Sequence, residues 1–347
     1  MTYNNKIAIF EGAEKLKYIE ETIEEIKSNQ VLVKIDATAI CTMEQRVYLG
    51  KMKPKMPFAG GHEVAGHVIQ CGGKVSSVSN GDVVALRLLT NCGHCHYCRT
   101  GNDNQCKTAF IAKFHQTVGG PGGLAKYIVV EEKNVYKVNK DVDVNYLSLT
   151  EPLACCIHSI NRCDINFGDD VVIIGAGIMG VFHTMLAKLK GARVIVTEVD
   201  EERLKVAKDN GADIVINSSK VDAVQYIKDL TDGRGADVVV NTVAISKVAE
   251  DAIKMAGKLG RIVFYSSFHP DNPIDFSPNS IHYSEAIVTG SVNPSNKDFL
   301  QATRLLSSNI INPESLISGH VSLDNLENGI AEALRPDTYR IIVDCNK

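Results

Sequence analysis

The sequence predicts an α/β fold of two domains, one irregular and mostly β, the other a doubly wound parallel sheet. The chain has 347 residues, which is more than a single hydrophobic core usually serves. Up to about residue 150, short β-type runs are broken by turn residues. From about 155 to 290, apolar strands alternate with helical stretches, as in a parallel sheet with crossover helices.

The composition restricts the classes of partner. With 44% hydrophobic and 22% charged residues, the profile is that of an ordinary globular protein. A net charge of -4 offers no basic excess for a nucleic-acid backbone or an anionic membrane. The N-terminus lacks a signal-type apolar run, and no segment reaches the roughly 18 apolar residues of a membrane helix. We expect a cytoplasmic protein without nucleic-acid or membrane partners, whose 10 cysteines serve metal or thiol roles.

The first domain is predicted from β-type runs at residues 31–35, 81–85 and 127–130. After about residue 293 the chain predicts a helix near 299–306 and a strand at 339–343, which we expect to return to this domain. We therefore expect one domain at 1–152 and 291–347 and the other at 153–290. The boundary near Pro152 rests on the change of period alone.

The second domain shows strand-like runs in regular succession. They lie at residues 171–174 and 193–197, near 214, and at 238–240 and 262–265. Helical stretches ending near Lys190 and Asn210 separate the first three. This alternation is typical of a doubly wound sheet with right-handed crossovers.

The first of these strands runs into Gly175-Ala176-Gly177-Ile178-Met179-Gly180, a G-x-G-x-x-G motif in its strand-turn-helix context. Gly175 allows the tight turn, Gly177 lets the backbone approach a pyrophosphate, and Gly180 permits close packing of helix on strand. Ile178 and Met179 open the helix whose N-terminus attracts the phosphates. The motif predicts a Rossmann dinucleotide site; a glycine-rich turn without a ligand is the alternative.

An acidic residue ends the second strand of this domain. Glu198 follows Gly180 by 18 residues, where a carboxylate can accept hydrogen bonds from an adenosine ribose and repel a 2′-phosphate. We therefore expect NAD rather than NADP. Arg203, five residues further on, could soften that repulsion.

Four cysteines form a second compact motif. Cys92, Cys95, Cys98 and Cys106 have the spacing C-x2-C-x2-C-x7-C within a lobe at about 91–107. Four thiolates can close a tetrahedron around zinc and leave no open position, so the site would be structural. An iron–sulfur cluster and a redox-active CxxC pair are the alternatives.

With these motifs in view, the chain resembles the zinc-containing medium-chain dehydrogenase/reductase family over essentially its whole length. The shared motifs are Cys41, 61–66 (GHEVAG), 81–82 (GD), the four-cysteine lobe, 123–127 (GLAKY), 151–154 (EPLA) and the glycine motif. The resemblance implies a GroES-like catalytic domain split around a Rossmann domain, with the active site in the cleft between them. It also implies that Cys41, His62 and Glu151 ligate a catalytic zinc, while Glu63 either ligates it or exchanges with water.

The chemistry of these residues supports the same interpretation. One thiolate, one imidazole and one carboxylate leave zinc an open position, from which it can polarise a substrate hydroxyl while an oxidised nicotinamide accepts hydride. Taken singly, His62 could be a packed or surface histidine and Cys41 an inert buried thiol. Their joint occurrence favours the metal site.

Three positions after Cys41 differ from the family pattern. Glu44 takes a position that usually holds Asp, which supports the metal ligands. Met43 and Arg46 stand where members often have a Ser or Thr and a His of a proton relay, so Thr42, a water or the cofactor ribose would have to substitute. Arg46 could instead recognise a phosphorylated or carboxylated polyol. Contact with a cofactor phosphate or a local carboxylate is the alternative.

The remaining cofactor contacts follow from the resemblance, because the family lines its nicotinamide pocket with residues that follow the fourth and fifth strands. These are Thr242, Val243, Tyr265, Ser266 and Ser267.

Together these features predict an enzyme with two zinc ions per chain that transfers hydride between NAD and a secondary hydroxyl of a polyol, sugar or sugar derivative. Glu151 in place of a third cysteine ligand resembles the polyol and threonine dehydrogenase branches. L-threonine or 2,3-butanediol is the alternative substrate, and a catalytically silent NAD(H)-sensing protein is the alternative class. The resemblance further implies a homo-oligomer, a dimer or a tetramer.

Overall fold

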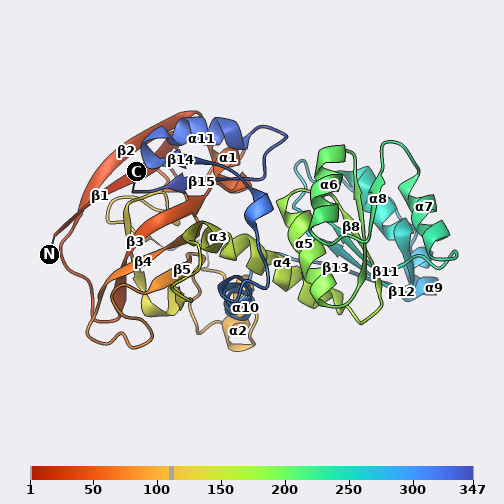
Figure 1. The fold of residues 1–347 in the computed structure, drawn as a ribbon, viewed down its shortest axis with the longest axis horizontal. Helices are drawn as coiled ribbons and strands as arrows, with labels where there is room; N and C mark the ends of the chain where they lie inside the picture. The colour runs from red at the N-terminus through yellow and green to blue at the C-terminus, as the bar shows by residue number, and fades with distance from the viewer. Residues whose placement is uncertain (1, 109–112, 347) are drawn as a thin grey trace. The chain divides into compact units, whose positions relative to one another are not determined.

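The computed structural model describes residues 2–108 and 113–346 and divides into two compact units (Figure 1). Unit 1 comprises Met1–Ala154 and Ser295–Lys347, and unit 2 comprises Cys155–Pro294. These divisions fall a few residues after the expected boundaries at 152 and 290, because helix α4 (Thr150–Cys163) runs continuously across the first of them. Pro152 does not interrupt α4, since it lies in the first turn, where no intrahelical donor is required.

Unit 1 is built on a seven-stranded sheet with the order β14-β15-β3-β4-β5-β7, in which β6 also pairs with β3, and on a separate hairpin of β1 and β2. The strands are β1 (Tyr3–Gly12), β2 (Lys15–Ile23), β3 (Gln30–Ala39), β4 (Glu63–Cys71), β5 (Val83–Arg87), β6 (Tyr127–Glu131), β7 (Val135–Lys137), β14 (Ile317–Ser322) and β15 (Arg340–Asp344). The predicted tail strand is β15, which pairs antiparallel with β3 through Ile342 opposite Ala39.

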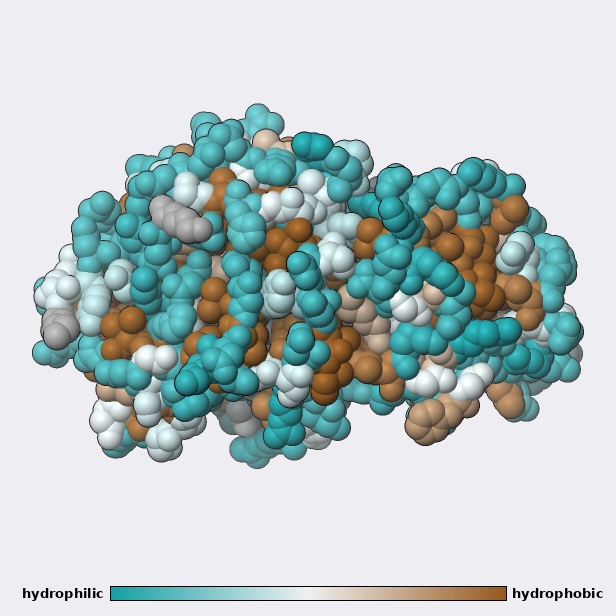
Figure 2. All heavy atoms as spheres, in the orientation of Figure 1, coloured by the Kyte–Doolittle hydropathy of each residue, from teal (hydrophilic) through white to brown (hydrophobic). Residues whose placement is uncertain are grey.

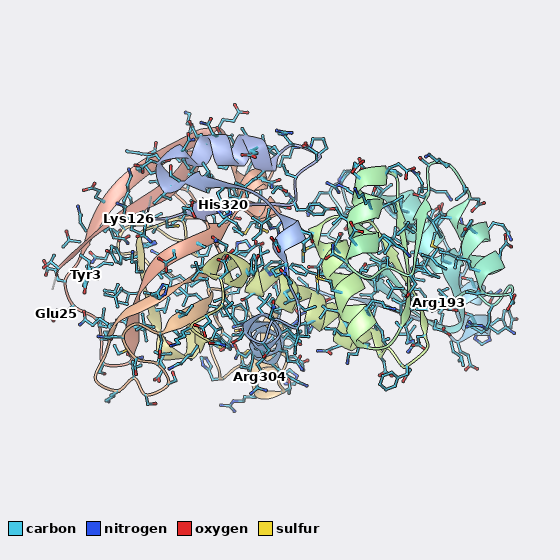
Figure 3. The ribbon with its side chains drawn as sticks, in the orientation of Figure 1. Tyr3, Glu25, Lys126, Arg193, Arg304 and His320 are labelled. Atoms are coloured by element: carbon cyan, nitrogen blue, oxygen red, sulfur yellow. The ribbon has the colours of Figure 1, made fainter. Side chains whose placement is uncertain are left out.

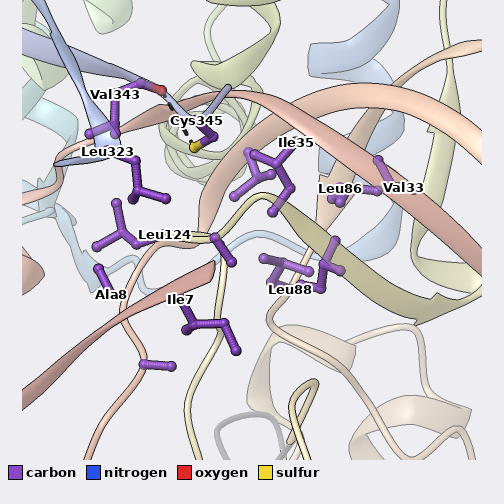
Figure 4. Packing of buried hydrophobic residues seen from close by; sticks show 14 of the residues in the cluster. Ile7, Ala8, Val33, Ile35, Leu86, Leu88, Leu124, Leu323, Val343 and Cys345 are labelled. Carbon is purple, nitrogen blue, oxygen red and sulfur yellow. Dashed lines mark hydrogen bonds between the residues drawn. The ribbon is translucent and has the colours of Figure 1, made fainter. Parts of the chain in front are cut away.

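A single apolar cluster holds unit 1 together. Ile7 and Leu124 are fully buried beside Ile35, Leu86 and Val343, which come from three strands of the sheet (Figure 4). Burying such side chains stabilises the fold by roughly 1.5–3 kcal/mol each. The cluster therefore packs β3, β5 and β15 against one another.

Short helices surround this sheet. They are α1 (Thr42–Tyr48), α2 (His96–Arg99), α3 (Val144–Ser148), α10 (Asn296–Ser307) and α11 (Leu326–Ala333). α10 begins with a capping box in which Ser295 and Asp298 satisfy each other's backbone amides. α1 matters most for function, because it begins directly after Cys41.

Unit 2 is a six-stranded parallel sheet with the order β10-β9-β8-β11-β12-β13. Its strands are β8 (Asp170–Ile174), β9 (Arg193–Glu198), β10 (Ile214–Asn217), β11 (Ala236–Asn241), β12 (Ala256–Phe264) and β13 (Ile287–Gly290). The helices are α5 (Ile178–Leu189), α6 (Glu201–Asp209), α7 (Ala223–Leu230), α8 (Ser246–Met255) and α9 (Pro278–Ser284). This is the strand order of a doubly wound dinucleotide-binding sheet, so the predicted fold class is confirmed.

Ion pairs close the amino-terminal edge of this sheet. The buried carboxylate of Asp170, at the start of β8, accepts from Arg193 at the start of β9 (Figure 3) and, at 2.8 Å, from Arg234. The carboxyl-terminal edge carries the glycine turn between β8 and α5 and an exposed ion pair of Lys220 with Glu201. The glycine turn makes this the edge at which a dinucleotide would bind.

Hydrophilic residues cover most of the face shown in Figure 2, and apolar residues gather there in separate patches. None of the helices in the described part of the chain combines the length and apolar character that a bilayer-spanning helix needs.

Candidate active site

Helix α1 presents Cys41 and supports it through Glu44. Cys41 is the N-cap residue in an extended conformation, and its backbone N–H donates to the Glu44 carboxylate at 3.2 Å. The same carboxylate is fully buried and accepts from the Gly61 backbone N–H at 2.8 Å. Glu44 thus joins the start of α1 to the loop that precedes β4.

Glu44 also orients His62. Its Oε1 lies 3.1 Å from Nδ1 of His62, so a neutral His62 that donates through Nδ1 leaves Nε2 free as a ligand. Burial by itself lowers the pKa of His62, but the Glu44 carboxylate and Cys41 outweigh it and hold the pKa well above its usual value. Burial favours the neutral acid of Glu44, yet His62 and the Gly61 amide lower its pKa overall. Glu44 therefore has the supporting position that its place after Cys41 predicted.

Arg340 joins Cys41 to Glu63. Its Nε and Nη2 both donate to the Glu63 carboxylate at 2.9 Å, and Nη2 lies 3.7 Å from the Cys41 sulfur. Both charged side chains are buried, Arg340 at 4% exposure and Glu63 at 0%. Burial alone would lower the pKa of Arg340, but Glu63 and Cys41 raise it above its usual value, so the guanidinium stays charged.

The potential ligand atoms form two overlapping groups. Sγ of Cys41 lies with Glu44 and His62, and His62 also lies with Glu63 and Glu151, each group with its atoms within 4.8 Å of one another. His62 belongs to both groups, and Glu151, in the first turn of α4, is 7% exposed. Sulfur, nitrogen and carboxylate oxygen are donors that zinc prefers, so the residues present fit a zinc ion.

Burial raises the pKa of the Cys41 thiol, and Glu63 adds to this effect. A thiolate in this environment therefore needs a nearby cation. Arg340 is one, and a metal ion would be the second. Both oxygens of the Glu63 carboxylate are already engaged by Arg340.

Three other residues of this region have different environments. Thr42, the first residue of α1, is exposed, while Met43 and Arg46 are partly buried on the same helix. The hydroxyl of Thr42 has no hydrogen bond to another described residue.

The four cysteines of the lobe also lie together, with their sulfur atoms all within 4.8 Å. The backbone N–H groups of Cys92 and Cys95 each donate to a sulfur of the group at 3.3 Å. Although burial raises it, hydrogen bonds from Thr108 and the Cys92 amide lower the pKa of Cys106 to about 6. The lobe is thus arranged to hold a cation with thiolates.

The glycine turn of unit 2 has the geometry its sequence predicted. Gly175 has φ +95°, and a Cβ there would lie 2.7 Å from Thr242 and Val243. A Cβ on Gly180 would lie 1.9 Å from the Gly175 carbonyl oxygen, whereas one on Gly177 would meet only Arg203 at 3.6 Å. The turn therefore brings the N-terminus of α5, which Ile178 and Met179 open, to the surface of the strand end.

Glu198 ends β9 beside this turn. Its carboxylate accepts from the backbone N–H of Ala176 at 2.9 Å and of Val199 at 2.7 Å. Arg203 lies near by, as its approach to Gly177 shows. A carboxylate and a guanidinium thus stand together at the place where the adenosine ribose is expected.

The predicted nicotinamide-side residues follow β11 and β12 at the same edge of the sheet. Thr242 donates to the Ile174 carbonyl at 2.7 Å, and Ser266 donates to the Thr242 carbonyl at 2.7 Å. Tyr265 packs edge-on against His183, with ring centroids 4.9 Å apart. The backbone N–H of Val243 donates to the side-chain Oδ1 of Asn241 at 2.9 Å. Ser267, the last residue of this predicted set, is exposed.

Sequence reasoning missed Arg340 as a member of the site. A charged residue heading the apolar run 341–343 was the available signal, because a buried strand holds a charge only when it is paired. Its partners lie 277 and 299 residues away in the chain, so no local spacing could identify them.

Comparison with known proteins gives a consistent result. The alcohol dehydrogenase GroES-like domain model matches residues 27–140, and the zinc-binding dehydrogenase model matches residues 179–308. Sorbitol dehydrogenase of Halalkalibacterium halodurans is 32% identical over 84% of this chain and 84% of its own. D-arabitol-phosphate dehydrogenase of Enterococcus avium is 26% identical over 96% of this chain and 95% of its own.

Solved structures agree. A zinc-binding dehydrogenase of Sinorhizobium meliloti 1021, solved with NADP, has a TM-score of 0.91 and 25% identity, and the match covers 99% of this chain and 100% of that one. A mixed donor cluster in one unit and a dinucleotide-type sheet in the other define a metal-dependent oxidoreductase. The chain belongs to the zinc-containing medium-chain dehydrogenase/reductase family, as its motifs predicted.

Proposed function

We propose that this protein is a zinc-dependent dehydrogenase that transfers hydride between NAD and a secondary hydroxyl of a polyol, sugar or sugar derivative. The observation that carries the proposal is the buried group around His62, which supplies sulfur, nitrogen and carboxylate donors from three distant segments. A zinc ion there would polarise the substrate hydroxyl as a Lewis acid. The polyol class also follows from the sorbitol and arabitol-phosphate dehydrogenases to which the chain is similar.

We assign the binding of two zinc ions and the orientation of His62 to particular residues. We assign Cys41, His62 and Glu151 as zinc ligands, because Arg340 holds both oxygens of Glu63. Glu44 keeps the His62 ring in the tautomer that a ligand needs. We assign the four cysteines of the lobe to a second, structural zinc ion.

The proton of the substrate hydroxyl needs a route to water. Met43 stands where the family's relay often has a Ser or Thr, and its side chain cannot pass a proton. The exposed hydroxyl of Thr42, next to Cys41, is the protein group closest in sequence that can pass a proton to water. The cofactor ribose and a bound water are the other routes.

NAD is the expected acceptor because of Glu198. Its carboxylate is fixed at the glycine turn by two backbone amides, so it cannot easily turn away from a 2′-phosphate. We expect Glu198→Ala to weaken NAD binding and to narrow the gap in kcat/KM between NAD and NADP. Equal kinetics of the variant and the wild type with both cofactors would contradict this role. Glu202→Ala, an exposed acid on α6, is the control.

A substrate panel tests the proposed activity. Polyols, sugar phosphates, L-threonine and 2,3-butanediol are offered to the zinc-loaded enzyme with NAD, and NADH absorbance is recorded. Metal analysis should give about two zinc ions per chain. A preference for L-threonine or 2,3-butanediol would identify the protein as a dehydrogenase of that substrate instead of a polyol dehydrogenase. If nothing is oxidised and only one zinc is found, the NAD(H)-sensing alternative replaces the enzyme.

A homo-oligomer fits the edge of unit 2. β13 pairs only with β12 among the described strands, and its other edge carries exposed Ile287 and Val288. An open apolar edge favours pairing with a second copy. Sedimentation of the wild type and of Ile287→Lys would test this.

The 10 free thiols also fit a reducing, cytoplasmic compartment.

A further inference from the structure

The segment that joins the two halves of the metal cluster is strongly basic. Between Glu44 and Glu63 the chain has Arg46, Lys51, Lys53 and Lys55 but no Asp or Glu, although the whole chain has a net charge of -4. We call residues 46–55 the basic segment. It begins within α1, which Cys41 starts, and is followed by the loop that ends at His62.

These four charges have no acidic partner. None of their side chains forms a hydrogen bond or ion pair with another residue in 2–108 or 113–346, whereas Lys137, for example, pairs with Asp82 at 2.8 Å. Arg46 is partly buried, and the three lysines are exposed. Four like charges repel one another, and an anionic ligand bound among them would relieve that repulsion.

Backbone hydrogen bonds hold the basic segment to the end of the helix that Cys41 starts. Arg46 follows Cys41 by five residues, about 7.5 Å along a helix axis. The N–H groups of Lys51 and Met52 then donate to the Arg46 carbonyl at 2.8 and 3.0 Å, which turns the chain back on the end of α1. Further along, Phe58 exchanges backbone hydrogen bonds with Phe10 at 2.8 and 3.0 Å. Both ends of the loop are therefore fixed to the core of unit 1.

The cluster itself does not attract anions. Three carboxylates and the Cys41 thiolate outweigh Arg340 and one divalent zinc ion, so the loaded site keeps a negative formal charge. An anionic group on the substrate must therefore be received at a distance from the metal. The basic segment is the candidate for that role, because it begins on the helix that Cys41 starts and carries four long cationic side chains.

We propose that the substrate is a phosphate monoester of a polyol or sugar, whose phosphate is bound by Arg46 together with Lys51, Lys53 and Lys55. The planar fork of Arg46 matches two phosphate oxygens, and the flexible lysines add positive charge around it. A dianion uses four cations better than a carboxylate does. This inference rests on the proposed function, since it specifies the substrate of the same site.

Paired substrates test the proposal on the zinc-loaded, full-length enzyme. Sorbitol is compared with sorbitol 6-phosphate and ribitol with ribitol 5-phosphate, and fructose 6-phosphate and xylulose 5-phosphate are offered with NADH for the reverse reaction. We expect kcat/KM to favour the ester about tenfold or more, since one charge-assisted hydrogen bond accounts for roughly that factor. The preference should arise mainly in KM and should shrink as salt increases.

Two variants assign the preference to the basic segment. Arg46→Met and the triple variant Lys51→Gln/Lys53→Gln/Lys55→Gln should each lower the ester-to-parent ratio of kcat/KM at least several-fold. The control removes three other exposed lysines of unit 1 that have no ion pair with described residues, Lys15→Gln/Lys74→Gln/Lys140→Gln, and should leave the ratio unchanged. Both triple variants change the net charge equally, so long-range effects cancel.

A binding measurement decides the question independently of turnover. Sorbitol 6-phosphate is titrated calorimetrically into the zinc-loaded protein without nucleotide, and Arg46→Met should weaken its binding. Unchanged binding in that variant overturns the proposal, as does a ratio at or below one in the wild type or a preference for gluconate over the ester. An equal loss on ester and parent with a raised KM for NAD would assign the segment to the cofactor pyrophosphate instead. If neither polyol nor ester is oxidised while the ester still binds through Arg46, the proposed function fails and this assignment stands.

Discussion

At the residue scale, Arg340 keeps a buried carboxylate charged next to the proposed metal ligands. Glu63 is completely buried and receives both of its hydrogen bonds from this one side chain. A carboxylate without that partner would have to take up a proton or turn toward the metal. We therefore expect Arg340 to determine whether Glu63 ligates the zinc ion or stays hydrogen-bonded to Arg340.

Replacing Arg340 should therefore affect both stability and chemistry. We expect Arg340→Met to lower the free energy of unfolding by about 3–5 kcal/mol, because it leaves a buried charge unpaired. Denaturant unfolding measures this loss. The double variant Arg340→Met/Glu63→Gln should recover part of it, since the unpaired charge is gone. A single variant as stable as the wild type would show that Glu63 is not held in this way.

Glu44 and Arg340 show what sequence reasoning can reach at this scale. Glu44 could be placed beside Cys41 because it lies three residues after it on one helix, and a local spacing fixes such a contact. Arg340 could not, because its contact with Glu63 depends on how β15 enters the sheet. Departures such as Met43 and Arg46 were visible, but what they contact is not contained in their spacing.

At the element scale, the turn from β8 to α5 contains two glycines to which we assign different roles, Gly180 in folding and Gly177 in ligand binding. Gly180 is required by the protein itself, since a Cβ there would overlap the Gly175 carbonyl. Gly177 has room for a methyl group in the free protein, so its role is to leave space for a ligand.

Alanine substitutions should therefore give opposite results. Gly177→Ala should leave the unfolding temperature unchanged and weaken NAD binding at least tenfold, because the methyl group would occupy the space where the pyrophosphate approaches. Gly180→Ala should lower the unfolding temperature by several degrees even without nucleotide, since helix and strand must move apart. Thermal unfolding and fluorescence titration with NADH measure both. Gly73→Ala, with open space around the site, is the control. Equal destabilisation by both substitutions would contradict the division of roles.

The elements themselves were largely predictable because their signals are local. Five of the six strands of unit 2, including β8 and β11, lie where apolar runs predicted them, since strands buried on both faces need such runs. The sixth strand, β13, is mostly exposed and was not predicted. The continuity of α4 across the unit boundary was not predicted. The hydrophobic period of the chain changes near Pro152, which suggested a boundary there, yet a proline in the first turn destabilises a helix little.

At the scale of the whole molecule, the two metal groups differ in what surrounds them. The cluster around His62 belongs to unit 1, which has a large apolar core, so we expect this unit to fold without the metal. In the lobe, α2 buries none of its residues, so a metal would have to replace a core. One site should therefore control activity and the other stability.

Two cysteine substitutions should separate these properties. Cys41→Ser should keep the unfolding temperature, because Ser is a good N-cap for α1, and should lower kcat at least a hundredfold, since the Lewis acid contributes several kcal/mol. Cys106→Ser should lower the unfolding temperature by on the order of 5 °C or more. Both variants should contain about one zinc ion per chain instead of two. A stable Cys106→Ser protein with full zinc content would contradict the structural assignment.

The pairing of β15 with β3 also has a consequence for biosynthesis. β3 and Glu63 emerge from the ribosome early, but Arg340 follows only after the whole of Cys155–Pro294 has been translated. At 5–20 residues per second, the segment of β3 that pairs with β15 waits roughly 15–60 seconds for its neighbour. During that interval the nascent chain exposes an unpaired strand edge, which chaperones can protect. Unit 2, being continuous in sequence, can reach its native state first.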